Sequence, residues 1–474
     1  MSKTESDICD SKLSIDECEL SILRQASDLA EDTHGRELVQ TDDVKKMIAI
    51  LENFLRKEKL VCYGGTAINN VLPKDAQFYN YETEIPDYDF YTPTAMDHAK
   101  KLADIYAKAG FKNVEAKSGV HHGTYKVFVN FIPIADLTLI HPDLFHAISK
   151  DCIVVNGIRY PPADFLRMNM YLELSRPAGH TARWEKVFKR LGLLNKHHPM
   201  KQKDCKNVEF SRSTKDFKGD SEILFGTVRD IMIHNKVIFF GSYASHLYSK
   251  HMSKSAQSKL KDVADFDVIT EDPEKVSDII TTRLKELNYS NIKVVKHTGI
   301  EEIVPDCLEV RVGNKAIALI YEPIACHNYN VVKVDGNDVR VATLDTMLNL
   351  YLAFYYSKKM IRSQSRILCM AGMLFDLQMK NRAKSKGLLK RFSISCEGEQ
   401  STMQSIFTTK KEKYKELKES GKTDTREFQE WFLNYSYEDG VFTGRDIKEK
   451  PKKRSKSVKR GKTNKRLTKK VHKK

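Results

Sequence analysis

The most constraining feature of the sequence is an internal repeat of four motifs. The first half contains YGGTAINN, PDYDFYTP, IADLTLI and NGIRYPPADFLRMNMYL; the second contains FGSYASHL, ADFDVITED, KAIALIYEP and DGNDVRVATLDTMLNLYL, in the same order. Equivalent residues are 177 to 179 positions apart, as shown by the pairs Gly64 and Gly241, Asp87 and Asp265, Gly157 and Gly336, and Leu166 and Leu344. Four ordered matches at one spacing indicate a duplicated domain of about 180 residues.

Strand-like and helix-like segments alternate inside each repeat. Apolar or alternating runs at 60–63, 87–91, 125–131 and 134–140 predict strands, with helical periodicity between them. Similar patterns recur at 222–345. We therefore expect an α/β (α+β) fold with two tandem domains, each a mixed central sheet flanked by helices.

A polar segment in the middle and the two ends of the chain set the predicted boundaries. Residues 196–221 are polar and aperiodic, which is typical of a linker or a long loop. The predicted parts are a helical segment 1–45, a first repeat domain 46–195, a linker 196–221, a second repeat domain 222–350, a C-terminal helical region 351–444 and a basic tail 445–474.

The net charge of +16 comes almost entirely from the end of the chain. Residues 450–474 contain 14 Lys and Arg and no acidic residue. Such a run is typical of a disordered arm that binds polyanions or of a nuclear-import signal. The whole chain is 41% hydrophobic, enough for sizeable cores, and has no run near the about 18 apolar residues of a membrane helix. We expect no membrane association.

The cysteines and the first residues bear on the compartment. Nine cysteines are scattered far apart without a CxxC pair, so we expect neither a zinc site nor a disulfide framework. The start, MSKTESDICD, lacks the apolar region of a secretion signal. Both features predict a reducing compartment.

A glycine turn in the first repeat is a candidate phosphate site. Gly64 and Gly65 follow a short apolar strand and lead into a helix start. Glycines let the backbone approach a phosphate, and the free N–H groups of a helix N-terminus favour an anion. Thr66 can add a hydroxyl. A tight turn without a ligand is the alternative.

Three acidic residues of the first repeat are candidates for a metal site. Asp87 and Asp89 are two positions apart, so on a strand their side chains point to the same side. Asp136 interrupts an apolar run, where a buried carboxylate is costly unless it is paired or binds a metal. Together they predict a site for two divalent ions about 4 Å apart. The alternatives are acids on a solvated face or at a strand end.

These motifs resemble those of the DNA polymerase β-like nucleotidyltransferases. The chain is more closely similar to the poly(A) polymerase catalytic subunits of large cytoplasmic DNA viruses, over roughly residues 45–360. The resemblance rests on YGGTAINN, PDYDFYTP, IADLTLI, the helical segment 164–174 and the duplicated layout. It implies that domain 46–195 is catalytic, and it implies ATP as substrate with two Mg²⁺ or Mn²⁺ ions. By this resemblance Gly64, Gly65 and Thr66 contact the ATP phosphates, and Asp87, Asp89 and Asp136 hold the metals.

The second repeat departs from this pattern at the third carboxylate. It keeps Gly241, Ser242, Asp265 and Asp267. Aligning IADLTLI with KAIALIY places Ala316, or Ala318 after a shift of two, opposite Asp136, and Glu309 is off register. Domain 222–350 is therefore predicted to be a degenerate copy with a structural or RNA-holding role, or one that binds a nucleotide without turning it over.

Two further segments have two readings each. Residues 183–190 mix basic and aromatic residues at helical spacing, so they line a nucleotide or primer path or form an amphipathic packing helix. His121 and His122 are interpreted as exposed loop residues rather than ligands.

The function predicted from these features is template-independent addition of AMP from ATP to RNA 3′ ends. The alternatives are a nucleotidyltransferase that makes a small oligo- or cyclic nucleotide, and a non-catalytic RNA-binding scaffold. The expected partners are ATP, an RNA 3′ end, and a second copy of the chain or a processivity subunit. The viral resemblance predicts the host cytoplasm (viral factory) and the virion as locations.

Overall fold

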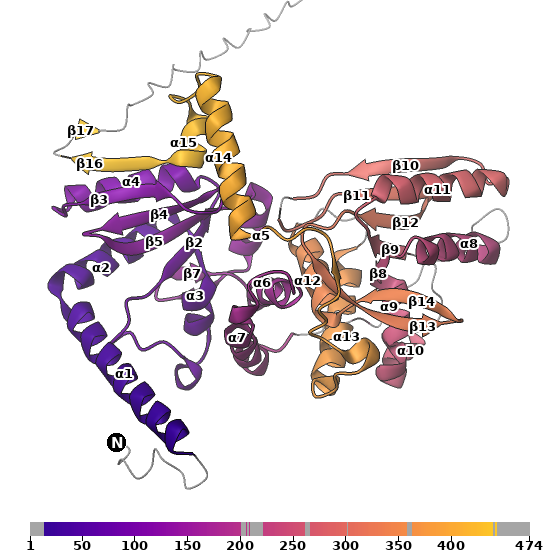
Figure 1. Ribbon diagram of the computed structural model, residues 1–474, viewed down its shortest axis with the longest axis horizontal. Coiled ribbons are helices and arrows are strands. Elements are labelled where there is room, and N and C mark those ends of the chain that lie inside the picture. The colour runs from indigo at the N-terminus through magenta and orange to yellow at the C-terminus, as the bar shows by residue number, and fades with distance from the viewer. Residues whose placement is uncertain are drawn as a thin grey trace, which may run out of the picture.

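The computed structural model describes residues 14–200, 205, 208, 221–260, 266–300, 302–357, 363–438 and 441–442. Two mixed β-sheets form the body, one from each repeat, with helices between and around them (Figure 1). The basic tail and Asp265 lie outside the described residues.

The first sheet is built from the first repeat and from the C-terminal segment. Its strands are β1 (Val61–Tyr63), β2 (Tyr88–Thr92), β3 (Val114–Ser118), β4 (Thr124–Val129), β5 (Ile132–Leu139), β6 (Ile153–Val155), β7 (Ile158–Tyr160), β16 (Asn434–Glu438) and β17 (Val441–Phe442). They lie in the order β17-β16-β3-β4-β5-β2-β1-β7-β6.

The second sheet is built from the second repeat. Its strands are β8 (Ile238–Phe240), β9 (Phe266–Ile269), β10 (Ile292–His297), β11 (Cys307–Val312), β12 (Lys315–Tyr321), β13 (His327–Val334), β14 (Asn337–Ala342) and β15 (Cys396–Glu397). They lie in the order β10-β11-β12-β9-β8-β14-β13-β15.

The two sheets share one topology. The series β3-β4-β5-β2-β1-β7-β6 of the first sheet corresponds strand by strand to β10-β11-β12-β9-β8-β14-β13 of the second. The parallel pairs also correspond: β1 with β7 and β2 with β5 in the first, β8 with β14 and β9 with β12 in the second. A register shift falls between Val127 and Phe128 of β4 and, at the equivalent place, between Val310 and Arg311 of β11. The predicted duplication is confirmed.

Helices cover both sheets. They are α1 (Ile15–Gln40), α2 (Asp42–Glu58), α3 (Gly64–Val71), α4 (Ala95–Lys108), α5 (Pro142–Lys150), α6 (Ala163–Leu174), α7 (Trp184–His197), α8 (Ser221–His234), α9 (Gly241–Tyr248), α10 (Lys254–Ser258), α11 (Pro273–Glu286), α12 (Leu344–Ser357), α13 (Gln364–Asn381), α14 (Met403–Glu419) and α15 (Arg426–Phe432). The predicted boundary at 350 falls within α12, and the domain limits remain a prediction.

Alternation along β2 sorts its side chains onto two faces. Tyr88, Phe90 and Thr92 are buried, whereas Asp89 and Tyr91 point to the opposite, partly exposed face. Successive residues of a strand face opposite sides, so burial of the aromatic set fixes the direction of the acid. The core therefore determines where the carboxylate points.

Helices of both repeats form the layer between the two sheets (Figure 1). Asn349 of α12 donates to the carbonyl of Met168 of α6 at 3.1 Å, and Tyr171 of α6 donates to Gln378 of α13 at 2.9 Å. These polar atoms are buried, and a buried hydrogen bond fixes the geometry because breaking it leaves an unpaired group. The contacts tie the two repeats together through this helical layer.

The C-terminal segment returns to the first repeat. Strand β16 pairs antiparallel with β3, and Arg426 of α15 forms an ion pair with Asp97 of α4 at 2.8 Å. Lys410 of α14 donates to the carbonyl of Gly119 at 2.7 Å. The predicted helical region 351–444 thus also contains strands, and it covers an edge of the first sheet.

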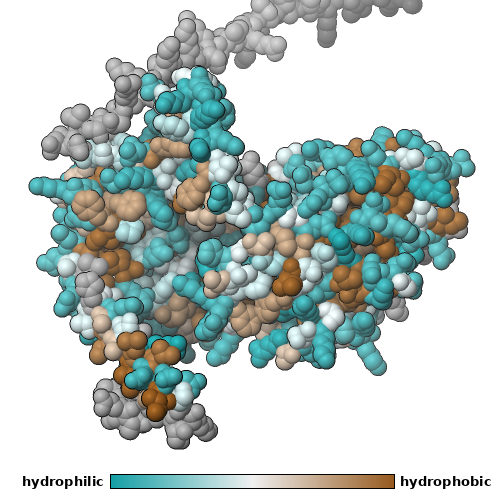
Figure 2. Space-filling view, viewed as in Figure 1, coloured by the Kyte–Doolittle hydropathy of each residue, from teal (hydrophilic) through white to brown (hydrophobic). Residues whose placement is uncertain are grey.

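Helix α1 extends away from the first sheet (Figure 1). Its exposed apolar residues are Ile15, Leu20, Ile22, Leu23 and Leu29. A brown patch lies over this end of the molecule, at the bottom of Figure 2. In the described part of the chain, no helix combines the length and the apolar character required to cross a bilayer.

The prediction that the cysteines form no disulfides is wrong for two pairs. Cys205 is bonded to Cys369 and Cys326 to Cys396, with Cα–Cα distances of 5.8 and 5.2 Å. The partners are 164 and 70 residues apart in the chain, so only the tertiary fold brings them together.

Candidate active site

Two of the predicted acids are direct neighbours on adjacent strands. In the parallel pair of β2 and β5, Asp89 is the register partner of Asp136. Residues in register on neighbouring strands point to the same face, so their carboxylates project side by side. Asp87 immediately precedes β2 and interacts electrostatically with both. The structure therefore brings the three predicted carboxylates to one face of the sheet.

Two of the three carboxylates have a raised affinity for protons. Burial, followed by the charges of Asp87 and Asp136, raises the pKa of Asp89 from 3.8 to about 7. Burial and the charge of Asp136 also raise the pKa of Asp87. Like charges held together away from water favour any cation that neutralises them.

A lysine that the sequence interpretation missed stands beside the acids. Lys126 of β4 is the register partner of Asp136 and forms an ion pair with it. The position alternates with the buried Tyr125 and Val127, so strand alternation alone places Lys126 on the same face as the acids. That alternation was visible in the sequence, but the pairing of β4 with β5 was not.

The glycine turn lies against Asp89. Gly64 begins α3 with φ +73°, in the left-handed region that favours glycine, and a Cβ there would collide with the Asp89 carboxylate. The N-terminus of α3 therefore opens directly beside the acids. Thr66 has another role than the predicted phosphate contact: it is fully buried, and its hydroxyl donates to the carbonyl of Asp87 at 2.6 Å.

An arginine from a distant helix closes the other side of the turn. Arg190 of α7 donates to the Tyr79 hydroxyl at 2.8 Å, and a Cβ on Gly65 would meet both. The buried Asn69 of α3 holds the loop that contains Tyr79, because its side-chain oxygen Oδ1 accepts from the backbone N–H groups of Phe78 and Tyr79. Of the two readings of segment 183–190, the geometry favours the nucleotide path for Arg190.

Two cationic side chains of α7 lie close enough to the acids to affect them. Lys186 and Arg190 both lower the pKa of Asp87 against the effect of burial. They are four residues apart on α7 and therefore share one helix face. With the open N-terminus of α3, this face presents N–H groups and two cations, the groups that bind a phosphate chain.

The donor set suits divalent cations of the magnesium type. Carboxylate oxygens are the ligands that Mg²⁺ and Mn²⁺ prefer. Burial, together with the neighbouring carboxylates, raises the pKa of Asp89, so a cation bound beside it would favour its charged form. In the arrangement described, Lys126 takes the place of a cation beside Asp136. Within the described residues, no three acidic, His or Cys side chains are yet close enough together to hold an ion.

A cavity of about 340 Å³ lies beyond the loop that joins β3 to β4. Arg176, Lys410, His121, His122 and Trp431 are among its lining residues. His121 and His122 are exposed loop residues, as expected, and the ring of His122 packs on Trp431 with centroids 4.2 Å apart. Cationic and aromatic side chains together favour single-stranded nucleic acid.

The second repeat keeps one acid of the site and loses another. Asp267 of β9 corresponds to Asp89, because each pairs with the strand that precedes the glycine turn. Its register partner on β12 is Leu319, so the residue in place of Asp136 is neither Ala316 nor Ala318, and that alignment was wrong by one or three positions. Gapless alignment failed because the connection between β10 and β11, residues 298–306, is longer than its counterpart between β3 and β4, residues 119–123.

Glu309, which the sequence comparison placed off register, is in register with the site. It lies directly opposite Leu319 on β11, which is the position of Lys126 in the first repeat. Its carboxylate, 1% exposed, accepts from His297 and Arg311, each at 2.8 Å. The lysine and the acid of the first site are thus replaced by an acid and a leucine.

Comparison with known proteins supports the resemblance found in the sequence. Residues 49–180, which include the glycine turn and all three acids, match the family model described as "Poly(A) polymerase catalytic subunit". The chain is 29% identical over 219 residues to a protein of Acanthamoeba polyphaga mimivirus described as "Putative poly(A) polymerase catalytic subunit". It is 27% identical over 177 residues to one from African swine fever virus.

These alignments cover parts of the proteins, whereas the fold is shared more widely. They span 44% and 36% of this chain, and 36% and 37% of the relatives, so the chain aligns with little more than a third of their length. The crystal structure of the Megavirus polyadenylate synthase superposes with a TM-score of 0.72 at 18% identity, covering 86% of this chain and 84% of that one. This similarity confirms the predicted fold class.

Proposed function

We propose that the chain is a template-independent polynucleotide adenylyltransferase that transfers AMP from ATP to the 3′ hydroxyl of RNA. The observation that carries the proposal is the register pairing of Asp89 with Asp136, with Asp87 beside them and the glycine turn against Asp89. The names of the viral relatives, poly(A) polymerase catalytic subunits, support the choice of ATP as substrate and of poly(A) as product.

The triphosphate of ATP binds along the face formed by the glycine turn and α7. Backbone N–H groups at Gly64 and Gly65 donate to phosphate oxygens, and Lys186 and Arg190 neutralise their charge. The base and ribose are thereby directed so that the α-phosphate lies beside the three acids. Thr66 acts indirectly, because its hydroxyl fixes the backbone of Asp87.

Transfer joins the 3′ oxygen of the RNA to the α-phosphorus and breaks the bond to pyrophosphate. The carboxylates of Asp87, Asp89 and Asp136 would hold two divalent ions, which supply Lewis-acid activation of the hydroxyl and neutralise the triphosphate. One carboxylate oxygen of the trio accepts the hydroxyl proton. Pyrophosphate leaves towards Lys186 and Arg190, so catalysis consists of positioning and electrostatic stabilisation.

The RNA approaches from the cavity that contains Arg176, Lys410 and Trp431. This cavity lies next to the β3–β4 connection, and β4 runs from that connection to the acids. The RNA therefore enters along β4, whereas ATP binds on the side of α7. The basic tail, with 14 cations in its last 25 residues, adds charge that attracts RNA in a salt-dependent way.

A protein partner fits the exposed apolar residues of α1. We propose that a second copy of the chain or a processivity subunit binds at this surface. Light scattering of the purified chain at several protein concentrations distinguishes the two, because only self-association raises the measured mass. By analogy with the viral relatives, we place the protein in the host cytoplasm and in the virion.

The test is incubation of the purified full chain with a short RNA primer, Mg²⁺ or Mn²⁺ and each NTP singly. Growth of the primer with ATP supports the proposal. A small nucleotide product formed without primer would identify the enzyme as an oligo- or cyclic nucleotide synthase instead. No turnover with any NTP, under conditions where RNA binds, would make it a non-catalytic RNA-binding protein.

A further inference from the structure

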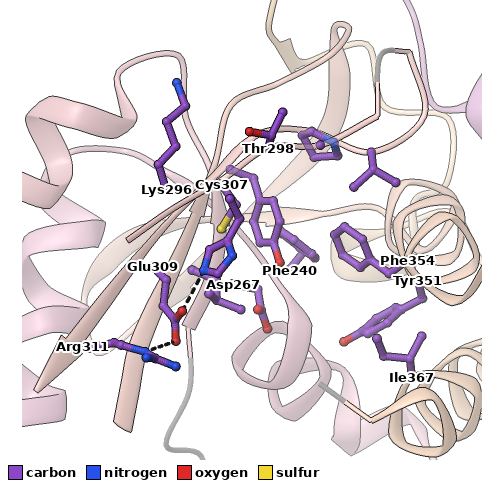
Figure 3. A pocket seen from close by; sticks show the side chains of 16 residues that line it. Phe240, Asp267, Lys296, Thr298, Cys307, Glu309, Arg311, Tyr351, Phe354 and Ile367 are labelled. Atoms are coloured by element: carbon purple, nitrogen blue, oxygen red, sulfur yellow. Dashed lines mark hydrogen bonds and ion pairs between the residues drawn. The ribbon is translucent and has the colours of Figure 1, made fainter. Parts of the chain in front are cut away.

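The second repeat contains a cavity of about 580 Å³ at the place that corresponds to the active site of the first. Asp267, Glu309 and Leu319, the counterparts of Asp89, Lys126 and Asp136, all line it. Figure 3 shows Glu309 and Arg311 on the strand side and Tyr351, Phe354 and Ile367 on the side of α12 and α13. The second repeat has thus kept one acid of the site, replaced the other acid and the lysine, and retained a cavity at that place.

The residues that line this cavity do not suit the nucleotidyl transfer proposed for the first repeat. Leu319 removes the acid that would complete a metal site with Asp267. The carboxylate of Glu309 is already neutralised by His297 and Arg311. With this ligand set, tight binding of a metal-bound triphosphate is not expected.

The lining instead suits a nucleotide held by stacking. Phe240, Tyr321 and Phe354 form a contiguous aromatic wall, with ring centroids 5.2 to 6.2 Å apart. Aromatic faces stack on bases of any sequence, and about 580 Å³ is within the range of small-ligand pockets.

Polar groups around this wall match the rest of a nucleotide. Asp267 can accept from ribose hydroxyls or from a base amino group. Arg311 faces the cavity from β11, and Lys296 lies at its rim, both suited to a phosphate (Figure 3). We propose that this cavity binds one nucleotide unit of the RNA strand and performs no chemistry on it.

The position of the cavity favours a strand residue over a free nucleotide. Glu302 lines the RNA-side cavity of the first repeat, whereas Val304 and Pro305 line the cavity of the second. One short loop therefore separates the two cavities, and an RNA that leaves the first reaches the second across it. This part of the inference rests on the proposed function, whereas the binding of a nucleotide unit does not.

The test uses a variant that fills the mouth of the cavity. Thr298 is exposed there, so Thr298→Trp blocks entry without disturbing the core. Affinity for a long oligo(A), measured by fluorescence anisotropy in EDTA, should fall about tenfold, the cost of one lost stacked base. Extension of a trinucleotide primer, which is too short to reach the second cavity, should be unchanged, whereas AMP additions per binding event on the long RNA should fall.

A matched control and a second ligand complete the experiment. Thr282→Trp makes the same substitution at an exposed position of α11, outside the cavity, and should bind RNA as the wild type does. If Thr298→Trp loses binding of AMP in equilibrium dialysis but not of oligo(A), the nucleotide is a free ligand and the cavity is still its site. Unchanged binding of both, or an equal loss in Thr282→Trp, overturns the proposal. A wild type that binds RNA but does not extend the trinucleotide contradicts the proposed function instead.

Discussion

Leu319 occupies in the second sheet the position that Asp136 occupies in the first, as register partner of the acid on the neighbouring parallel strand. On the next strand, Glu309 takes the place of Lys126. The first repeat thereby gathers carboxylates next to a lysine that forms an ion pair with one of them, whereas the second gathers an apolar side chain and an acid that is already paired. The two repeats share a fold and differ in the chemistry that this one face permits.

Removing one carboxylate of the first repeat should abolish transfer without unfolding the protein. Asp136→Asn keeps the shape of the side chain but removes the charge needed to bind a divalent ion. We expect the rate of AMP incorporation to fall at least about a thousandfold. Single-turnover extension of a labelled RNA primer measures the effect, and circular dichroism confirms that the fold is intact.

The equivalent substitution in the second repeat is the control. Asp267→Asn changes the counterpart of Asp89, and we expect it to retain extension of a short primer, because the second repeat performs no transfer. A loss as complete as that in Asp136→Asn would show that the second repeat is catalytic. The same logic applies to Asp265→Ala, which should also spare the chemistry.

Restoring the missing acid should destabilise the second repeat. Leu319 is 1% exposed and faces Glu309 across the strand pair, so Leu319→Asp adds a buried charge near Asp267 and Glu309. We expect the free energy of unfolding to fall on the order of 3 kcal/mol, as measured by urea denaturation. Leu319→Met, which keeps the volume, should change it by less than about 1.5 kcal/mol. Equal stability of the two variants would show that water or a cation already reaches this position.

The arginine beside the glycine turn should affect ATP more than RNA. Arg190→Ala removes a cation from the phosphate face, and we expect the KM for ATP to rise about tenfold while the KM for primer stays within twofold. Lys189→Ala, one residue earlier on α7 and exposed, is the matched control. If both variants behave alike, Arg190 only packs against Tyr79.

The raised pKa of Asp89 predicts how stability depends on pH in the absence of metal. Between its ordinary value of 3.8 and about 7, the folded protein keeps a proton on Asp89 that the unfolded chain has lost. The wild type should therefore lose stability relative to Asp89→Asn as the pH rises through this window, and the difference should level off above about pH 7. Urea unfolding in EDTA at several pH values measures it. A difference that is constant with pH would mean that Asp89 titrates normally.

Part of the site could be predicted from local sequence alone. The spacing of Asp87 and Asp89 places them on one side of a strand, and burial of Tyr88 and Phe90 confirms the direction. The turn at Gly64 was predictable from the glycine pair, whereas its contact with the Asp89 carboxylate is known only from the structure. Lys126 could not be assigned, because its role depends on which strand lies next to β4.

The misalignment of the second repeat has a similar cause. KAIALIY contains several positions that match IADLTLI when slid along it, and alternation by itself does not fix which residue faces which neighbour. Pairing with β9 selects Leu319. The disulfides Cys205–Cys369 and Cys326–Cys396 were missed for the same reason, because their partners are close only after folding.

The order and spacing of motifs thus determined that this protein is a duplicated α/β chain whose first half carries an acid trio next to a glycine turn. Those properties are periodic or local, and each is decided within a few residues of the chain. The partners of the trio, the loss of the second site and the cavity that remains there were decided only by strand register and helix packing. Such contacts join residues tens to hundreds of positions apart, and the free energy that selects them belongs to the folded core as a whole.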